Sequence, residues 1–219
     1  MFKSLSLKVI IFGFIFTFFS SFGQSFFIGL FNPSVRDTLN ISHGQFGSIY
    51  ATATLLSSFL FIWVGKKIDD INVLRFALYV TVLLSFSCFF FSKISSIVFL
   101  FIAIFLMRFS GQGMMSHTAS TTISRYFTKS RGKALSIGWF GLSVAEFILP
   151  VTIIYLLTIY NWQNIWIGIS LIVIIFLPIL SYYLVQNLNF ESRETDDQNL
   201  SDNKIKDWKR IEVIKDYRF

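Results

Sequence analysis

Six apolar stretches, each close to the about twenty residues that a helix needs to cross a lipid core, fill most of this chain. A helix satisfies its own backbone hydrogen bonds in lipid, whereas an isolated strand does not. The mean hydropathy of +0.64 fits this assignment. We therefore predict an all-α fold, a polytopic membrane bundle of six transmembrane helices. The expected spans are Val9–Phe31, Gln45–Val64, Phe76–Phe91, Ile97–Ala119, Ala134–Leu157 and Ile165–Val185.

The net charge of +7 comes from Lys and Arg residues that flank the apolar stretches. They alternate between a rich side and a poor side, and the rich side of such proteins faces the cytoplasm. We therefore expect a multi-pass protein of the cell inner (plasma) membrane with both termini cytoplasmic. No basic patch accompanies a recognition element, so we expect no nucleic-acid partner. The rich side holds Lys3, Lys8, Lys66, Lys67, Arg75, Arg125, Lys129, Arg131 and Lys133, and the other side holds Arg36 and Lys93.

The chain changes character after the sixth span. Residues 1–186 are expected to form the bundle and residues 187–219 a cytoplasmic linker. Within that linker, Lys204–Phe219 repeats apolar residues at helical spacing among charged ones, which predicts an amphipathic helix on the membrane surface.

Catalytic and metal-binding patterns are missing from the sequence. Cys88 is the single cysteine, which excludes a disulfide framework or a thiolate metal cluster. His43, in an expected outer loop, has no second ligand nearby. The motifs of zinc peptidases, serine hydrolases and nucleotide-binding loops are also missing. We therefore expect no enzyme activity, no metal and no cofactor.

Arg108 is the most costly residue within the spans, because a charge near the bilayer centre costs at least about 2.5–3.5 kcal/mol. Gln112 lies one turn further on and shares its face. Glu146 is the one carboxylate within a span. Counting about 1.5 Å per residue places Arg108 and Glu146 at nearly the same depth, which predicts an ion pair between consecutive helices. The pair either only neutralises both charges or binds an anionic substrate at Arg108, with Glu146 releasing it or carrying a proton.

A polar stripe on the first span consists of Gly13, Thr17, Ser20 and Gln24. It either faces the substrate, with Gln24 as the contact, or joins helices through hydroxyls and amide. His117 lies nine residues after Arg108, which in an α-helix places it on the opposite face. Small and polar residues recur in the same order in spans one to three and four to six, which suggests two three-helix repeats.

Several motifs resemble those of the Major Facilitator Superfamily. The loop from Gly65 to Arg75 resembles the signature loop between its second and third spans, with Gly65, Asp69 and Arg75 matching. A second series runs from Arg108 through Gln112 and Gly113 to Glu146 and Pro150. It is similar to a bacterial branch distantly like monocarboxylate and oxalate/formate carriers. The end of the chain resembles the segment that leads into a seventh span.

This resemblance implies one six-helix half of a twelve-helix fold and transport by alternating access around a central site. It implies substrate or ion contacts at Gln24, Arg108, Gln112 and Glu146. Gly65, Asp69 and Arg75 would belong to a cytoplasmic gate, whose Asp would normally pair with the other half. The expected function is secondary active transport of a small organic anion across the lipid bilayer, with proton coupling as one option, by a truncated half that would pair with a C-terminal half. The alternatives are a half-size carrier that works as a homodimer and a non-transporting membrane scaffold.

Overall fold

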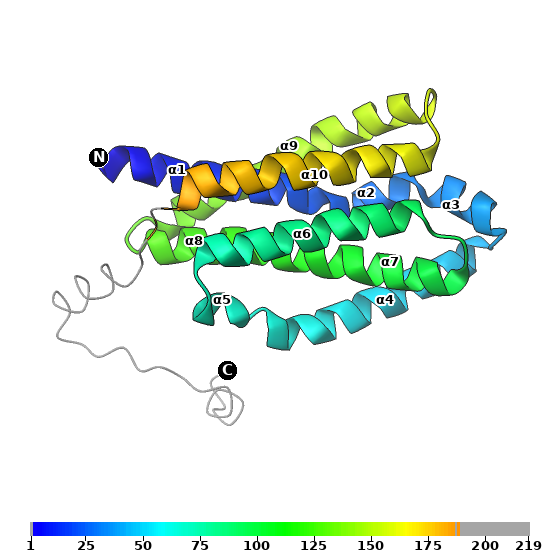
Figure 1. The fold of residues 1–219 in the computed structure, drawn as a ribbon, viewed down its shortest axis with the longest axis horizontal. Coiled ribbons are helices and arrows are strands. Elements are labelled where there is room, and N and C mark those ends of the chain that lie inside the picture. The colour runs from blue at the N-terminus through cyan, green and yellow to red at the C-terminus, as the bar shows by residue number, and fades with distance from the viewer. Residues whose placement is uncertain (1, 187, 189–219) are drawn as a thin grey trace. The chain divides into compact units, whose positions relative to one another are not determined.

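The computed structural model describes residues 2–186 and 188, and all regular structure in them is helical (Figure 1). Apart from Leu188, the expected linker over 187–219, with its amphipathic helix, lies outside the described residues. The elements are α1 (Phe2–Ser20), η1 (Ser21–Gly23), α2 (Ser25–Leu30), α3 (Asn32–Leu39), α4 (His43–Val64), α5 (Lys67–Asp70), α6 (Val73–Ser92), α7 (Ile97–Met107), η2 (Arg108–Met115), α8 (Ser116–Tyr126), α9 (Arg131–Leu157) and α10 (Trp162–Val185).

The six predicted spans are confirmed, since six described helical segments are long and apolar enough to cross a membrane. Two of them are irregular. The first span breaks at Gln24, between η1 and α2, and the fourth passes through a π-helix, η2, and ends at Tyr126 rather than near Ala119. The expected outer loop before the second span contains a helix, α3, that the sequence analysis missed. His43 does not lie in that loop but begins α4.

Local side-chain bonds explain where several helices begin. Ser42 and Gln45 form a capping box at α4, in which each side chain bonds the backbone of the other. Asn72 accepts from the amide of Leu74 at 2.9 Å and caps α6. Asn40 ends α3 in the left-handed conformation, with φ of 51°, which asparagine tolerates better than most residues. The first two caps lie in the short connections before the second and third spans and fix where those two spans start.

The first span packs against the fifth along its polar stripe. Thr17 is fully buried and donates to the carbonyl of Gly138 at 2.6 Å. Gly13 faces Gly138 closely enough that a Cβ on either would collide with Ile123. For Gly13 and Thr17 the structure therefore favours the joining role over the substrate role, since close approach and hydroxyl bonds are what hold helices together in lipid.

The third and sixth spans, α6 and α10, form the most extensive helix pair in the described bundle. Ser85 donates to the carbonyl of Ser170 at 3.0 Å, and Ser170 donates to the carbonyl of Ser85 at 2.9 Å. This reciprocal arrangement is what two related three-helix units would produce about a shared axis. Nearby, Trp166 is fully buried against Phe27, Phe31 and Phe91.

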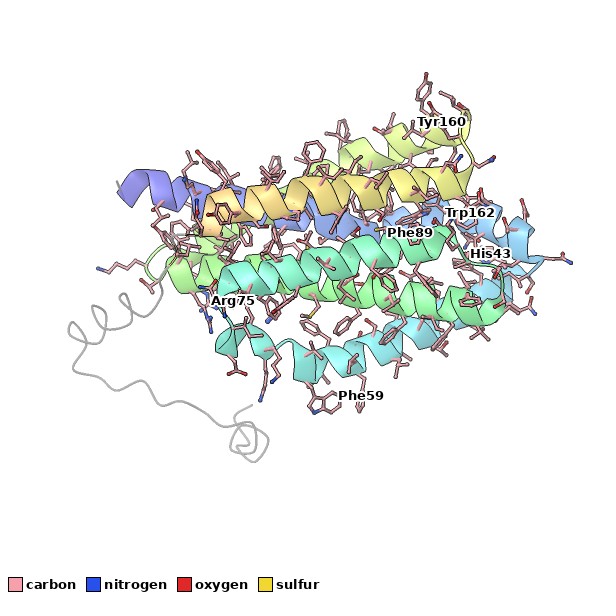
Figure 2. The ribbon with its side chains drawn as sticks, in the orientation of Figure 1. His43, Phe59, Arg75, Phe89, Tyr160 and Trp162 are labelled. Atoms are coloured by element: carbon pink, nitrogen blue, oxygen red, sulfur yellow. The ribbon has the colours of Figure 1, made fainter. Side chains whose placement is uncertain are left out.

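The second and fifth spans are the least covered. Only 11% of the apolar window of the segment beginning with α4 and 17% of that of α9 are buried, against 39–50% for the other spans. Phe59 on α4 projects away from the bundle and is 60% exposed (Figure 2). The cavity that Arg108 lines borders these two helices.

Candidate functional site

The break in the first span lies beside the start of the π-helix. Gln24 is extended, with φ of −83° and ψ of 155°, so α2 starts anew at Ser25. A Cβ on Gly111 would lie 2.6 Å from Gly23 N and 2.7 Å from Gly23 Cα. Only glycine permits this backbone contact. Two irregular helices thus meet at one point, and irregular backbone within a membrane is usual where it borders a cavity or binding site.

Arg108, the first residue of η2, is directed toward that break. Its Nη1 donates to the carbonyl of Gly23 at 2.9 Å and to Ser25 Oγ at 3.3 Å. Its guanidinium lies 5.3 Å from the ring centre of Tyr50, whose hydroxyl donates to Ser25 Oγ at 2.9 Å. The side chain is 7% exposed, yet its Nε has no hydrogen-bond partner. Arg108 is thus positioned by neutral groups alone and retains its charge and a free donor.

The expected ion pair between Arg108 and Glu146 is wrong. Among the residues whose side chains the structure describes (5–186 and 188), the one salt bridge joins Arg125 to Asp69, and Glu146 is exposed on α9. Matching their depths fixed only the position of each residue along its helix axis. The rotation of each helix about that axis decides where a side chain points, and the guanidinium turns toward the α1–α2 break instead. The buried cation therefore has no acidic partner in the described bundle.

A partly open cavity of about 350 Å³ lies between α4, the η2–α8 segment and α9. Such a volume is at the lower end of the range for small-molecule sites. Three of the polar atoms on its lining residues are buried without a partner: Arg108 Nε, Thr54 Oγ1 and Ser116 Oγ. Buried polar groups are normally satisfied, so three such atoms beside one cavity are unusual for the interior of a bundle. The lining consists of Thr54, Ser57, Ser58, Phe61, Arg108, Gln112, Gly113, Ser116, His117, Ser120 and Trp139.

His117 lines the same cavity as Arg108, which corrects the expectation that it lies on the opposite face. The reason is the π-helix between them. Its i→i+5 hydrogen bonds place more residues in each turn than an α-helix does, so nine residues no longer correspond to two and a half turns. His117 Nε2 lies 2.9 Å from the carbonyl oxygen of Gly65, and its ring packs edge-on against Phe61 at 5.3 Å.

The four residues expected at the substrate site therefore separate. Arg108 and Gln112 line the cavity, Gln24 is half-buried at the start of α2 beside Arg108's acceptor, and Glu146 is not among the lining residues. A stripe of hydroxyl residues on α4, followed by Phe61, was not predicted from the sequence. Thr54, Ser57, Ser58 and Phe61 follow i, i+3, i+4, i+7 spacing, the same signal that was recognised on the first span.

The expected gate residues lie at the end of the bundle that carries α5. Asp69 accepts from Arg125 Nη2 at 2.5 Å, and Arg125 Nη1 also donates to the carbonyl of Ile68 at 3.4 Å. Asp69, which the resemblance would pair with the other half, is thus paired with Arg125 within this bundle. Gly65 supplies the carbonyl that bonds His117. Arg75, beside α5 at the start of α6, is exposed and makes no ion pair with a described residue (Figure 2).

Comparison with known proteins identifies the family. Residues 13–215, nearly the whole chain, match the sequence model of the family described as Major Facilitator Superfamily. A search of curated proteins and a search of solved structures each found no match.

Proposed function

This chain belongs to the Major Facilitator Superfamily and is therefore a multi-pass membrane transporter, and we propose that it carries a small organic anion bound at Arg108. The observation that supports this proposal is a buried guanidinium with neutral partners only, beside a cavity. A buried cation is stabilised by an opposite charge, and an anionic ligand would supply one. The nearby hydroxyls of Thr54 and Ser116 would bond the same ligand.

The cavity size limits the cargo to a small molecule. About 350 Å³ accommodates a short mono- or dicarboxylate together with some water. The motif series from Arg108 to Pro150 resembles carriers of monocarboxylates and of oxalate or formate, so lactate and oxalate are suitable probes. Gln112 lines the same wall and would orient the bound carboxylate. For Gln24 and Glu146 we propose contact with the substrate or coupling ion at another stage of transport.

We further propose secondary active transport by alternating access, in which this bundle rocks against a second six-helix bundle. The support is the low burial of α4 and α9, which border the cavity. The second bundle is either a C-terminal half or a second copy of this chain. Chemical crosslinking and mass measurement in detergent separate these cases, since a strictly monomeric chain excludes the second copy. The non-transporting scaffold predicts no ligand-dependent stabilisation.

The proposed orientation places both termini and the α5 end of the bundle in the cytoplasm, in the inner membrane. It rests on the Lys and Arg residues of the α4–α6 and α8–α9 connections. Gly65, Asp69 and Arg75 would then form part of the cytoplasmic gate, with Arg125 as the partner of Asp69 in the arrangement seen here.

Binding of lactate and oxalate to the purified full chain in detergent tests the cargo proposal. Arg108→Gln removes the charge but keeps an amide donor. Because hydrogen bonds to charged groups contribute about 1.5–3 kcal/mol, the affinity should fall by about tenfold to a hundredfold. Arg131→Gln, an identical substitution at the exposed start of α9, is the matched control and should bind as the wild type does. Lactamide, the neutral analogue of lactate, should bind weakly to all three proteins. Equal binding of lactamide and lactate, or unchanged affinity in Arg108→Gln, refutes the proposal.

A further inference from the structure

His117 connects the cavity to the end of α4. Its side chain lines the cavity that holds Arg108, and its Nε2 lies 2.9 Å from the carbonyl oxygen of Gly65, the C-cap of α4. A carbonyl oxygen only accepts hydrogen bonds, so Nε2 must carry a hydrogen in this arrangement. On the other side of the ring, Nδ1 lies 3.5 Å from Thr121 Oγ1, a hydroxyl that can donate or accept.

Protonation strengthens this contact. The imidazolium carries hydrogens on both nitrogens, so it always donates to Gly65, whereas neutral histidine also has a tautomer with a lone pair at Nε2. In that tautomer the lone pair of Nε2 would face the lone pairs of the Gly65 carbonyl oxygen, and the hydrogen bond between them would be lost. A charged donor also forms a stronger hydrogen bond than a neutral one. In addition, Gly65 ends a helix of 22 residues, whose C-terminal dipole favours a cation.

A proton on His117 has an opposite charge close to it in the cavity only when an anion is bound there. Arg108 is the one other charged side chain that lines it. On the elements around the cavity, the α4–α5 segment (residues 65–70) carries Lys66, Lys67, Asp69 and Asp70, α8 carries Arg125, and α9 carries Arg131, Lys133 and Glu146. Asp69 is paired with Arg125. Two cations beside one cavity repel each other, and a bound anion relieves that repulsion. Anion binding and proton binding must then favour each other by the same factor.

Two side chains of α8 hold the α4–α5 segment, one at each end. His117 bonds Gly65 at its start, and Arg125, eight residues further along α8, bonds Asp69 and the carbonyl of Ile68. Arginine stays charged at all physiological pH values, whereas histidine, with an ordinary pKa of about 6.5, changes its charge within that range. Of the two attachments, the one that borders the cavity is thus made by the residue type whose charge can change in this range.

We propose that His117 is the proton-binding residue of this transporter: it takes up a proton together with the anion held at Arg108, and this tightens the attachment of α8 to the α4–α5 segment. The joint uptake of proton and anion rests on the proposed function, whereas the tighter attachment of α8 does not need a ligand. The proposal assigns to His117 the proton role that the sequence had suggested for Glu146. The proton binds at Nδ1 while Nε2–H stays bonded to Gly65.

The first test measures lactate affinity of the full chain in detergent at pH 5.5, 6.5 and 7.5, a range in which lactate stays ionised. His117→Gln retains an amide that can donate to Gly65 but does not titrate. His43→Gln, at the opposite end of α4, is the matched control because it removes the other histidine of the chain. The wild type and His43→Gln should lose about fivefold in affinity between pH 5.5 and 7.5, which is what a tenfold coupling of proton and anion binding gives over this range for a histidine with an ordinary pKa of about 6.5. His117→Gln should show the same affinity at all three pH values. A pH dependence that persists in His117→Gln overturns the proposal, as does a wild type without any.

The second test needs no ligand. A spin label on Lys67→Cys, an exposed position on the α4–α5 segment, reports its mobility, and the native Cys88 is fully buried. The label should be less mobile at pH 5.5 than at pH 7.5, and His117→Gln should abolish the difference while His43→Gln leaves it. If wild-type lactate binding fails at every pH, the proposed function is refuted and this measurement alone decides the role of His117. A mobility that does not change with pH, or changes equally in His117→Gln, overturns it.

Discussion

The contact between Gly23 and Gly111 is the most demanding packing feature of the site, and Gly111→Ala tests it. The added Cβ would lie 2.6 Å from Gly23 N, 2.7 Å from Gly23 Cα and 3.3 Å from the carbonyl oxygen of Ser20. All three are backbone atoms, so no side-chain rotation relieves the collision. Non-bonded carbon atoms are most stable at about 3.5–4.0 Å, so η2 and the first span would have to separate by about 1 Å.

That separation has a cost that can be worked out from the structure. Arg108 Nη1 would move from 2.9 Å to about 4 Å from the carbonyl of Gly23, beyond hydrogen-bonding distance. Overpacking costs about 1–3 kcal/mol and the loss of a hydrogen bond to a charged group about 1.5–3 kcal/mol. Alanine recovers about 1 kcal/mol through its higher helix propensity. The net loss should be about 3 kcal/mol, which lowers the melting temperature of a chain of this size by about 6–12 °C.

Thermal unfolding of the full chain in detergent, followed by circular dichroism, measures this loss. Gly168→Ala on α10 is the matched control, because a Cβ there meets no atom within 4 Å. It should leave the melting temperature unchanged or raise it slightly. If Gly111→Ala melts within about 2 °C of Gly168→Ala, which corresponds to at most about 1 kcal/mol, the two backbones are not in contact and the reasoning fails.

Two further predictions concern contacts away from the cavity. Ser85→Ala and Ser170→Ala should each destabilise the bundle by about 0.6 kcal/mol. Because each hydroxyl donates to the partner's backbone carbonyl, which alanine retains, an unchanged stability in either variant would mean that its bond between α6 and α10 does not form. Asp69→Asn and Arg125→Gln should each change stability by less than about 1 kcal/mol, because both side chains are partly exposed, at 59% and 30%. Reversing the charge of either residue alone should raise the mobility of a spin label on the α4–α5 segment. Exchanging the two residues should bring the mobility back to that of the wild type, and a failure to do so would contradict the pairing.

The residues of the site show which inferences from sequence hold. Arg108 was recognised from the cost of burying its charge, and Gln112 from its position one turn away; both line the cavity. Two inferences that required an angle about a helix axis failed. Arg108 and Glu146 do not pair, and His117 shares the cavity with Arg108 although ideal α-helical geometry had placed it opposite.

The residues expected at a gate show the same division. Gly65 and Asp69 were recognised from their spacing in the signature loop. Their partners, His117 and Arg125, belong to a different span, more than fifty residues away along the chain. No local pattern indicates which of several basic side chains in the nearby connections bonds Asp69, since all of them would satisfy the spacing equally well.

The sequence by itself determined that this chain crosses a membrane six times and which of its polar residues are costly to bury. Both properties are local, because the length of an apolar stretch and the desolvation of a charge depend on a few consecutive residues. Only the tertiary structure decided which of those residues meet. That outcome depends on the rotation of each helix and on irregularities such as the π-helix at Arg108–Met115 and the break at Gln24. Such features are stabilised by contacts between distant segments, here the approach of Gly23 to Gly111, and so they have no signal in either segment alone.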